Sequence, residues 1–492
     1  MGPHGLHESA EAVIDGTIED AMSAFAPHVA DALTALYVAG SGDGRATAES
    51  VRRRTGQLIV LARHLRTHPF STLEGARSRV GADRAAFGEL LRLLRTTDAV
   101  RDTVLDGPAR KYWRNTVLPM ERAGVFDDIL GNRPRFPYRV GLYPGPTCMF
   151  RCSFCARMSG ARYAASSLPD GERALAAVVD EAPADDPFTF YISGGLEPLT
   201  NPGAGALVRR IARRGMKASM YTNGFSLNAA TLRRQPGLWD LHTLRISLYG
   251  TSEKEYAAVT TRTGAFARVR SNVADFLRER AERAAPVRVG FNYVILPGRA
   301  AQLPEVVAYL ADLRPDSAGR PVDFLTVRED YSGREGGALS PRDRDELADA
   351  MHTAEKIAAE RLPGLEIDYG YALHGIRHGT LQSLPRIDAG TMRPAAYPQA
   401  SVVVDLLGDV YLYREAAFPE LPGADRYVIG RVTADRGLLA IVGDFVASGR
   451  EIVSAPGDPY FLDAFDQVVT ARLNQVEADI GDGWDLLRGA LR

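Results

Sequence analysis

The chain has 492 residues, of which 45% are hydrophobic and 24% charged, and its formal net charge at neutral pH is −2. This length predicts two or three domains, and the composition is that of a globular protein. The small net charge provides no overall field that would attract nucleic acid, and no apolar run reaches the roughly 20 residues that a membrane helix needs. Residues 1–9 lack the basic and apolar regions of a signal peptide, so we expect a cytoplasmic protein. No pattern indicates an oligomeric state.

Residues 1–130 predict a helical N-terminal domain. Apolar residues recur at three- and four-residue steps from Ile18 to Leu36, and the pattern resumes in Leu58–Leu65 and Phe87–Leu94. This spacing places the apolar residues on one buried helix face. No residue pattern in this part indicates chemistry, so we expect it to be only a helical cap.

Residues 131–365 predict an α/β fold, because short apolar strands alternate there with amphipathic helices. The six expected strands are Tyr138–Tyr143, Phe188–Ser193, Ala218–Thr222, Leu244–Leu248, Val287–Leu296 and Val322–Val327. The six expected helices are Gly171–Glu181, Ala204–Arg213, Leu227–Arg234, Phe266–Arg283, Pro304–Leu313 and Arg342–Arg361. Six such repeats favour a parallel sheet that closes partly, that is, a partial (β/α)6 barrel of the TIM type. Chemistry in such barrels takes place at the C-terminal ends of the strands.

Residues 366–492 predict an α+β C-terminal extension that caps the substrate. Val402–Leu406 and Val410–Tyr413 flank the sequence Leu-Gly-Asp at 407–409, which favours a β-hairpin. Phe461–Leu473 is expected to be a final helix.

The chain contains three cysteines, Cys148, Cys152 and Cys155, in a CxxxCxxC motif just past the first expected strand. An odd number of cysteines cannot all pair in disulfides, and a group of them in a cytoplasmic protein favours metal binding. Three thiolates can hold three irons of one [4Fe–4S] cluster and leave the fourth iron for another ligand. A zinc site is disfavoured, because zinc motifs pair CxxC units and no His lies within ten residues of this loop.

This motif at the end of a first strand resembles the radical S-adenosylmethionine (SAM) superfamily. The resemblance implies that SAM binds the fourth iron and that an electron from the cluster cleaves SAM to a 5′-deoxyadenosyl radical. It also implies that Phe154, before the last cysteine, packs on the adenine.

Further motifs extend the resemblance to the SAM site. The stretch Ser-Gly-Gly-Leu-Glu-Pro at 193–198 resembles the superfamily's GGEP element, with one Leu inserted. Consecutive glycines let a backbone edge approach a ligand closely. The resemblance implies that Gly194, Gly195 and Glu197 contact the methionyl amino group. It implies contacts to the ribose and carboxylate from Asn223 and Ser247, which end the third and fourth strands.

Longer stretches between Pro69 and Arg492 resemble the sugar deaminases of the desosamine pathway. The stretches that carry this likeness are residues 141–148, 193–202, 328–333, 405–415 and 466–475. The resemblance implies an ammonia-lyase of macrolide antibiotic biosynthesis, which eliminates ammonia from TDP-4-amino-4,6-dideoxyglucose to give the 3-keto-4,6-dideoxy sugar. It implies a flavodoxin or ferredoxin as the electron donor. Direct elimination and prior migration of the amine to C3 both remain open, as does whether SAM is consumed.

Such a substrate requires cations for its diphosphate, proton-transfer groups for its sugar and an aromatic ring for thymine. Arginine matches phosphate in bidentate geometry, so the expected diphosphate ligands are Arg328, Arg393 and Arg414. Carboxylates transfer protons, so the expected catalytic residues are Glu329, Asp330 and Glu415. Further expected substrate contacts are Asn292, Tyr331 and Tyr371, with Tyr413 as an alternative partner for thymine.

Three other functions compete with the deaminase. A radical SAM dehydrogenase of a sugar nucleotide would oxidise the sugar and keep the amine. A radical SAM peptide-modifying enzyme would explain Ser247–Gly250 and Glu255–Tyr256, but such enzymes commonly carry auxiliary clusters, for which no cysteine remains. A non-catalytic iron–sulfur sensor would explain neither the open iron nor the glycine-rich element.

Overall fold

The protein is described here by a computed structural model that covers residues 48–155, 160–313, 322–330, 339–380 and 387–484. It divides into two compact units. Unit 1 comprises residues 1–124, 380–385 and 468–492, and unit 2 comprises residues 125–379 and 386–467. The boundaries that the sequence predicts at residues 130 and 365 remain predictions.

Unit 1 is helical in its described residues. Its elements are α3 (Ala48–Thr67), α4 (Leu73–Val80), α5 (Arg84–Thr96), α6 (Asp98–Leu105), α7 (Arg110–Tyr112), the π-helical turn Trp113–Val117, α8 (Leu118–Arg122) and most of α19 (Ala464–Gly481). Thr72 and Asp83 cap α4 and α5 by accepting hydrogen bonds from Gly75 and Ala86 backbone N–H groups. The helix expected between Ile18 and Leu36 lies outside the described residues.

Buried polar contacts join the two ends of the chain inside unit 1. The guanidinium of Arg472 on α19 donates to the carboxylate of Glu121 on α8 across 2.7 Å, and both side chains are buried. Asp479 accepts a hydrogen bond of 2.6 Å from the Leu73 backbone N–H at the start of α4. The last helix is therefore an integral part of this unit.

Unit 2 is built on one ten-stranded sheet. Its strands are β1 (Arg139–Leu142), β2 (Phe190–Ile192), β3 (Ser219–Thr222), β4 (Thr243–Leu248), β5 (Arg288–Ile295), β6 (Phe324–Glu329), β7 (Glu366–Tyr369), β8 (Ser401–Val404), β9 (Asp409–Tyr411) and β10 (Val428–Arg431). Their order is β10-β9-β8-β1-β2-β3-β4-β5-β6-β7, with parallel neighbours from β8 to β7 and antiparallel pairing of β8, β9 and β10. The sheet is open at β10 and β7, so it forms a partial barrel, as predicted.

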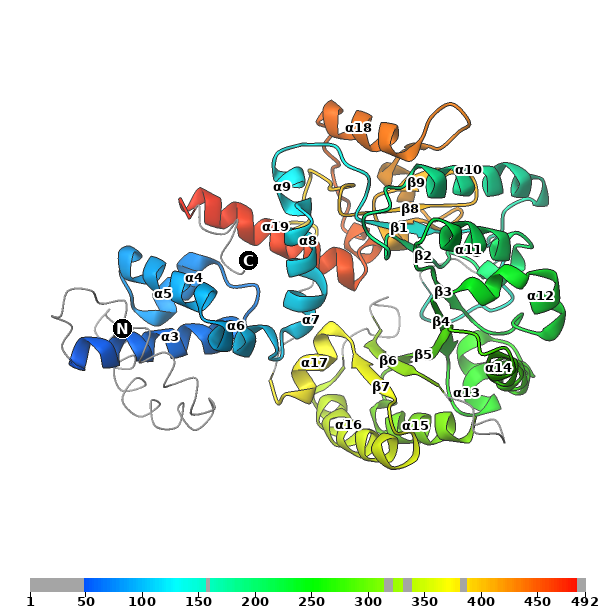
Figure 1. Cartoon of the computed structure of the whole chain (residues 1–492), viewed down its shortest axis with the longest axis horizontal. Helices are drawn as coiled ribbons and strands as arrows, with labels where there is room; N and C mark the ends of the chain where they lie inside the picture. The colour runs from blue at the N-terminus through cyan, green and yellow to red at the C-terminus, as the bar shows by residue number, and fades with distance from the viewer. Residues whose placement is uncertain (1–47, 156–159, 314–321, 331–338, 381–386, 485–492) are drawn as a thin grey trace. The chain divides into compact units, whose positions relative to one another are not determined.

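Helices cover the outer side of the sheet (Figure 1). They are α10 (Leu168–Glu181), α11 (Ala204–Arg213), α12 (Ala229–Arg234), α13 (Glu253–Thr260), α14 (Ala265–Glu282), α15 (Leu303–Asp312), α16 (Pro341–Arg361) and α18 (Leu438–Ser448). Unit 2 also contains α9 (Val125–Leu130) and α17 (Tyr371–Arg377), the second of which contacts β6 and β7. The six predicted strands and six predicted helices of the barrel are all present, with slightly shifted ends. The predicted hairpin is also present, as β8 and β9.

The position of that hairpin is not predicted by its sequence. β8 pairs in parallel with β1, from Arg139 opposite Ser401 to Leu142 opposite Val404. The hairpin, which the sequence analysis assigns to the C-terminal extension, therefore adds strands to the barrel sheet next to β1. On the other side of the sheet, β7 adds one strand next to β6. Both additions place C-terminal residues beside the ends of the barrel strands.

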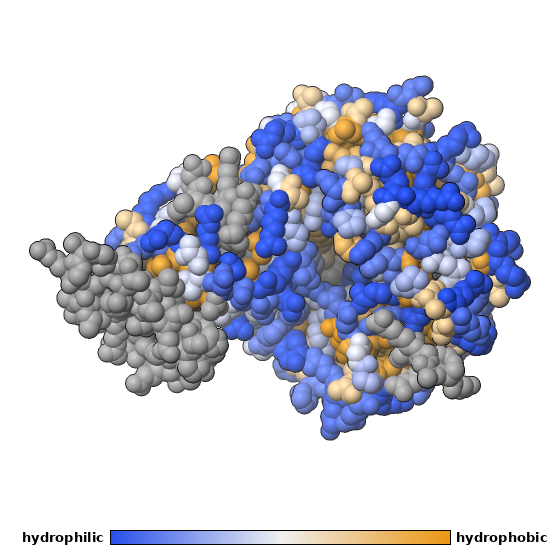
Figure 2. Space-filling model, viewed as in Figure 1, coloured by the Kyte–Doolittle hydropathy of each residue, from blue (hydrophilic) through white to orange (hydrophobic). Residues whose placement is uncertain are grey.

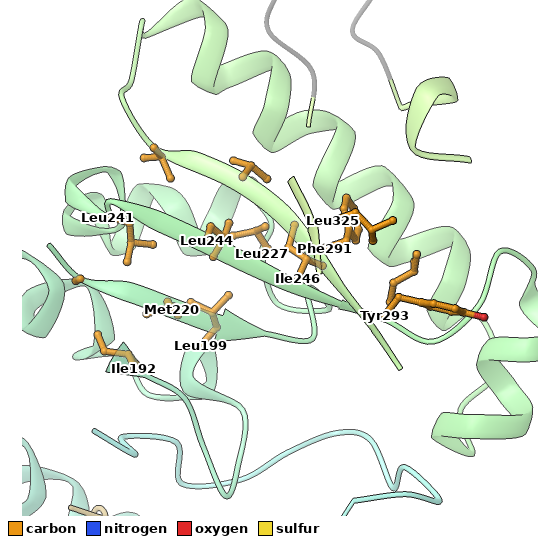
Figure 3. Packing of buried hydrophobic residues seen from close by; sticks show 14 of the residues in the cluster. Ile192, Leu199, Met220, Leu227, Leu241, Leu244, Ile246, Phe291, Tyr293 and Leu325 are labelled. Atoms are coloured by element: carbon orange, nitrogen blue, oxygen red, sulfur yellow. The ribbon is translucent and has the colours of Figure 1, made fainter. Parts of the chain in front are cut away.

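The two faces of the central strands differ in chemistry. On β4 the side chains of Leu244, Ile246 and Leu248 are buried under the helices, whereas Arg245 and Ser247 on the opposite face are only partly buried. Figure 3 shows the apolar face, where Ile246 packs near Phe291. Because successive strand residues point to opposite faces, the inner face is left for polar side chains.

Hydrophilic side chains predominate on the face of unit 2 in Figure 2. Among the residues that the structure describes, no helix is both long enough and apolar enough to cross a membrane.

Candidate active site

A cavity of about 900 Å³ lies in unit 2 at the C-terminal ends of the barrel strands. Strand ends from β1 to β6, the cysteine loop and two C-terminal segments form its wall. The lining includes Tyr143, Cys152, Phe154, Cys155, Tyr191, Ser193, Gly194, Tyr221, Ser247, Tyr249, Asn292, Arg328, Glu329, Asp330, Arg414, Glu415, Phe418, Arg426, Asp458, Tyr460, Phe461 and Asp463. Its location is the one that the barrel rule predicts.

Strand register explains which side chains reach this cavity. Ser247 on β4 lies opposite Asn292 on β5, and Val294 lies opposite Arg328 on β6. All four belong to the inner face of the sheet, since they follow the two-residue alternation of their strands. The Oδ1 atom of Asn292 is buried and has no hydrogen-bond partner in the structure, so this side chain is suited to receive a donor from a ligand.

The cysteine loop is held by backbone contacts with the end of α13. The Arg151 and Ser153 N–H groups donate to the Thr260 and Val259 carbonyls, each across 3.0 Å. The Cys155 N–H donates to the Cys152 carbonyl across 3.1 Å, which closes a turn between these two cysteines. Cys152 and Cys155 line the cavity. The thiol of Cys148 lies 3.7 Å from the Asn223 amide nitrogen.

The chemistry of this loop fits an iron–sulfur cluster. Three soft thiol ligands share one loop, none is in a disulfide, and each is only partly buried. Among the residues that the structure describes, no three Cys, His, Asp or Glu side chains stand in a closed metal-binding arrangement. The fit therefore rests on the donor set and its place at the cavity wall.

The glycines of the glycine-rich element at 193–198 are needed for the packing of the chain. A Cβ at Gly194 would collide with the Leu196 carbonyl, and one at Gly195 would collide with the Ala417 carbonyl. Gly194 lines the cavity, whereas Gly195 packs against the segment at 417–418. Both positions thus require glycine for packing of the chain itself.

Glu197 lies outside the cavity lining and is almost completely buried. Its carboxylate accepts hydrogen bonds from the Thr222 hydroxyl at 2.6 Å, the Asn223 N–H at 2.8 Å and the Leu199 N–H at 3.1 Å. Burial raises the pKa of this carboxyl despite these bonds. The contacts join the loop after β2 to the end of β3.

Asn223 also lies outside the cavity lining, in contact with the cysteine loop. Its amide donates to the Met149 sulfur across 3.1 Å, and its carbonyl oxygen accepts from the Phe225 N–H across 2.9 Å. Glu197 and Asn223 therefore form a chain of contacts from β2 through β3 to the cysteines.

A cluster of charged and phenolic groups, which come mostly from the C-terminal part of the chain, also lines the cavity. Arg414 pairs with Asp463 across 2.6 Å, and its Nε donates to the Tyr191 hydroxyl across 2.9 Å. Burial and the neighbouring Asp463 raise the pKa of Glu415 to about 7, although Arg414 and Arg328 oppose the shift. This carboxyl therefore exchanges its proton near neutral pH.

The phenol of Tyr221 lies among arginines in the same cavity. Burial would raise its pKa, but Arg245, Arg328 and Arg414 outweigh burial and lower it. The guanidinium of Arg245 lies 5.6 Å from the centre of the Tyr221 ring. The site thus contains a second acidic group whose ionisation is assisted by arginine.

The remaining predicted residues are placed as follows. Phe154, Ser247, Glu329 and Asp330 line the cavity, as do all the members of the Arg414 cluster named above. Tyr331 lies outside the described residues. Tyr371 begins α17, and neither Tyr371 nor Arg393 belongs to the cavity lining. Tyr413 is fully buried between Tyr397 and Tyr427.

Several of the residues that line the cavity were not identified by the sequence analysis. Tyr143, Tyr191, Tyr221 and Tyr249 lie at or just past the ends of the first four strands. This repeated position of tyrosine is a signal that the sequence contains. Asp463 has no such signal, since it reaches Arg414 only through the fold.

Comparison with known proteins agrees with the fold and the cysteine motif. The family model described as the radical SAM superfamily matches residues 142–310. The chain belongs to this superfamily, and its cofactors are a [4Fe–4S] cluster and SAM. Over 435 residues it is 53% identical to the dTDP-4-amino-4,6-dideoxy-D-glucose ammonia-lyase of Streptomyces venezuelae, which covers 88% of this chain and 90% of that enzyme.

Solved structures show more distant similarity. Streptococcus suis SuiB bound to S-adenosylmethionine is 16% identical, with a TM-score of 0.40 over 68% of this chain and 71% of that one. The structure of anSMEcpe with bound AdoMet is 14% identical, with a TM-score of 0.42 over 72% of this chain and 98% of that one.

Proposed function

We propose that this enzyme is an ammonia-lyase that converts dTDP-4-amino-4,6-dideoxy-D-glucose into the 3-keto-4,6-dideoxy sugar nucleotide. The observation that carries the proposal is the cavity, which brings the cysteine loop and a Glu415 carboxyl with a pKa of about 7 to one space. The 53% identity with the Streptomyces venezuelae enzyme supports the same substrate. The product belongs in a deoxyamino-sugar pathway of antibiotic biosynthesis.

The cysteine loop and the neighbouring strand ends hold the cofactors in this proposal. Cys148, Cys152 and Cys155 are the cluster ligands, since they are the only thiols in the chain. When bound, the cluster and SAM together supply a 5′-deoxyadenosyl radical that removes hydrogen from the sugar C3. Phe154, Gly194 and Ser247 line the cavity, where Phe154 would pack on the adenine of SAM and the other two would contact the rest of it.

Glu197 and Asn223 contribute to SAM binding indirectly in this proposal. Their polar atoms are engaged with the ends of β2 and β3 and with the cysteine loop. We infer that they hold the SAM-binding backbone in place.

Glu415 is the proton acceptor for the C3 hydroxyl. Loss of hydrogen from C3 makes that hydroxyl more acidic, so a carboxylate that ionises near neutral pH is matched to the task. Arg414, held by Asp463 and Tyr191, fixes the adjacent backbone. Glu329 and Asp330, which line the cavity at the end of β6, keep the departing amine protonated.

The diphosphate is bound by arginines of the same cavity. Arg328 on β6 lines the cavity, and no ion pair is recorded for its guanidinium among the described residues. Arg426 also lines it and is paired with Asp458. We assign Arg328 as the principal phosphate ligand, because Arg414 is committed to Asp463.

Elimination is favoured over net oxidation. With three cysteines the chain holds one cluster, so no auxiliary cluster is available to take an electron from the sugar radical. Expulsion of the neighbouring amine needs no acceptor. The protonated amine leaves C4 as ammonia, and the radical that remains at C4 gains one hydrogen atom to give the 4-deoxy product. That hydrogen comes either from 5′-deoxyadenosine or from an electron of the external reductant together with the proton that Glu415 took.

Product analysis tests the function directly. The reconstituted enzyme, SAM, a reductant and dTDP-4-amino-4,6-dideoxy-D-glucose should yield ammonia in step with the 3-keto-4,6-dideoxy product, detected by mass spectrometry. A 3-keto sugar that retains its amine would identify a dehydrogenase and overturn the proposal. The cytoplasmic location and the flavodoxin or ferredoxin donor remain predictions.

A further inference from the structure

Three exposed arginines lie on the cysteine loop or are linked to it by contacts, and all three lie outside the cavity lining. Arg151 belongs to the loop itself, between Cys148 and Cys152, and its side chain is exposed. Arg262 and Arg268 follow α13 and begin α14, and both are exposed. None of the three lines the cavity, so none is available to the sugar nucleotide in that space.

Arg262 and Arg268 converge on one aromatic ring. Their guanidinium carbons lie 4.4 and 4.0 Å from the ring centre of Phe225. Such cation–π contacts hold a guanidinium while leaving its N–H groups exposed to solvent. Arg262 also donates to the Met149 carbonyl in the cysteine loop across 3.5 Å.

A short aromatic path leads from this ring to the cysteines. The Phe225 ring packs edge-on against Phe150 with 5.5 Å between ring centres. Phe150 lies between Cys148 and Cys152 in sequence and contacts Tyr249, which lines the cavity. The arginine pair is therefore linked through Phe225 and Phe150 to the segment that holds the cluster ligands.

The charge of this surface is not cancelled locally. No ion pair is recorded for Arg151, Arg262 or Arg268 among the residues that the structure describes, whereas Arg209 and Arg210 elsewhere in unit 2 pair with Asp240 and Asp180. The nearby Glu253 accepts from the Ala267 N–H across 3.4 Å. A net positive surface therefore stands next to the cluster loop.

We propose that Arg151, Arg262 and Arg268 form the docking surface for a small acidic one-electron redox protein. The inference rests on the cluster assignment in the proposed function, but not on the identity of the sugar. The carrier is oxidised by one electron and the cluster is reduced by one electron, which is consumed in cleaving the sulfonium C–S bond of SAM. The chain contains no cysteine for a second cluster, so this electron enters from outside.

Electrostatic docking of this kind has measurable consequences. A positive patch that meets a negative one accelerates encounter, and this gain weakens as salt shortens the screening length to about 8 Å at physiological ionic strength. Affinity for the acidic carrier should therefore fall steeply with ionic strength, and reversing the arginine charges should remove most of that dependence.

The test compares three charge-reversal variants of the reconstituted holoenzyme. The loop variant is R151E, the paired variant is R262E/R268E, and the matched control is R213E/R234E. Arg213 and Arg234 are exposed arginines of unit 2 outside the aromatic path to the cysteines. Iron content is measured for every variant, so that cluster loss is recognised.

Binding of flavodoxin is measured by calorimetry at low and physiological salt, and 5′-deoxyadenosine formation is measured with reduced flavodoxin and with dithionite. We expect R151E and R262E/R268E to weaken flavodoxin binding by about tenfold or more at low salt. Their flavodoxin-driven rate should fall in parallel, while the dithionite-driven rate and the control variant stay within about twofold of wild type.

Unchanged flavodoxin affinity in both loop-side variants would overturn the docking surface, as would an equal loss in R213E/R234E. Equal losses with flavodoxin and dithionite would show damage to the cluster loop instead and would also refute it. Failure of the deaminase proposal is seen separately, because SAM cleavage and carrier binding are measured without the sugar.

Discussion

Glu415 is the residue on which the proposed proton transfer depends, and its pKa of about 7 is set by burial and by Asp463. The carboxyl must be ionised to accept a proton, so kcat/KM should decline as pH falls below about 7. Glu415→Gln should lower kcat about 100-fold or more and abolish that acid limb. A pH–rate profile of ammonia release checks both effects.

Asp463→Asn tests how the pKa of Glu415 is set. Removing the negative charge lets Arg414 and Arg328 favour ionised Glu415, so the acid limb should move to lower pH. The exposed Asp435→Asn is the matched control and should leave the profile in place. If the acid limb of the pH–rate profile stayed at the wild-type pH in Asp463→Asn, Asp463 would not be what raises the pKa of Glu415.

Phe154 makes a second prediction at the residue scale. Its ring lines the cavity between Cys152 and Cys155 and lies 6.1 Å from the Tyr249 ring. Phe154→Ala should weaken SAM binding by roughly 1 kcal/mol, or about fivefold, because stacking with adenine is lost. Equilibrium binding of SAM measures this, with iron content as the control. If Phe154→Ala bound SAM as tightly as wild type, Phe154 would contribute only to packing of the protein.

At the scale of elements, Glu197 links the loop after β2 to β3. Glu197→Ala would leave the Thr222 hydroxyl and the Asn223 and Leu199 N–H groups without their acceptor in a buried place. We expect the free energy of unfolding to fall by at least about 2 kcal/mol. Chemical denaturation measures this loss.

The matched control is Glu360→Ala, an exposed glutamate at the end of α16. It should change the free energy of unfolding by less than about 0.5 kcal/mol. If Glu197→Ala retained full stability but lost SAM affinity, Glu197 would be a direct ligand of SAM, as the motif resemblance implies.

At the scale of the whole molecule, the cysteine count sets the cofactor content. Only Cys148, Cys152 and Cys155 are available in 492 residues, so anaerobic reconstitution should give about four irons per chain. Cys152→Ala should abolish formation of 5′-deoxyadenosine while the chain stays folded by circular dichroism. About eight irons per chain, or SAM cleavage in Cys152→Ala, would contradict a single cluster held by this motif.

Local patterns determine much of the site. The cysteine spacing, the glycines at 194–195 and the strand–helix repeats are short-range signals, and the strands that they predict carry Ser247, Asn292 and Arg328 into the cavity by simple alternation. The same alternation would have selected Tyr191 and Tyr221. Such signals suffice because side-chain direction in a strand follows from sequence position alone.

The sequence by itself thus determined the class of fold, the cluster-binding loop and part of the strand-end residues that line the cavity, namely Ser247, Asn292, Arg328 and Glu329. Only the tertiary structure decided that β8 joins β1, that Asp463 pairs with Arg414, that Glu197 is engaged by β3 and that Tyr413 is buried away from the cavity. These facts depend on segments far apart in the chain. Burial and pairing across such distances are set by packing of the whole unit, which local periodicity does not encode.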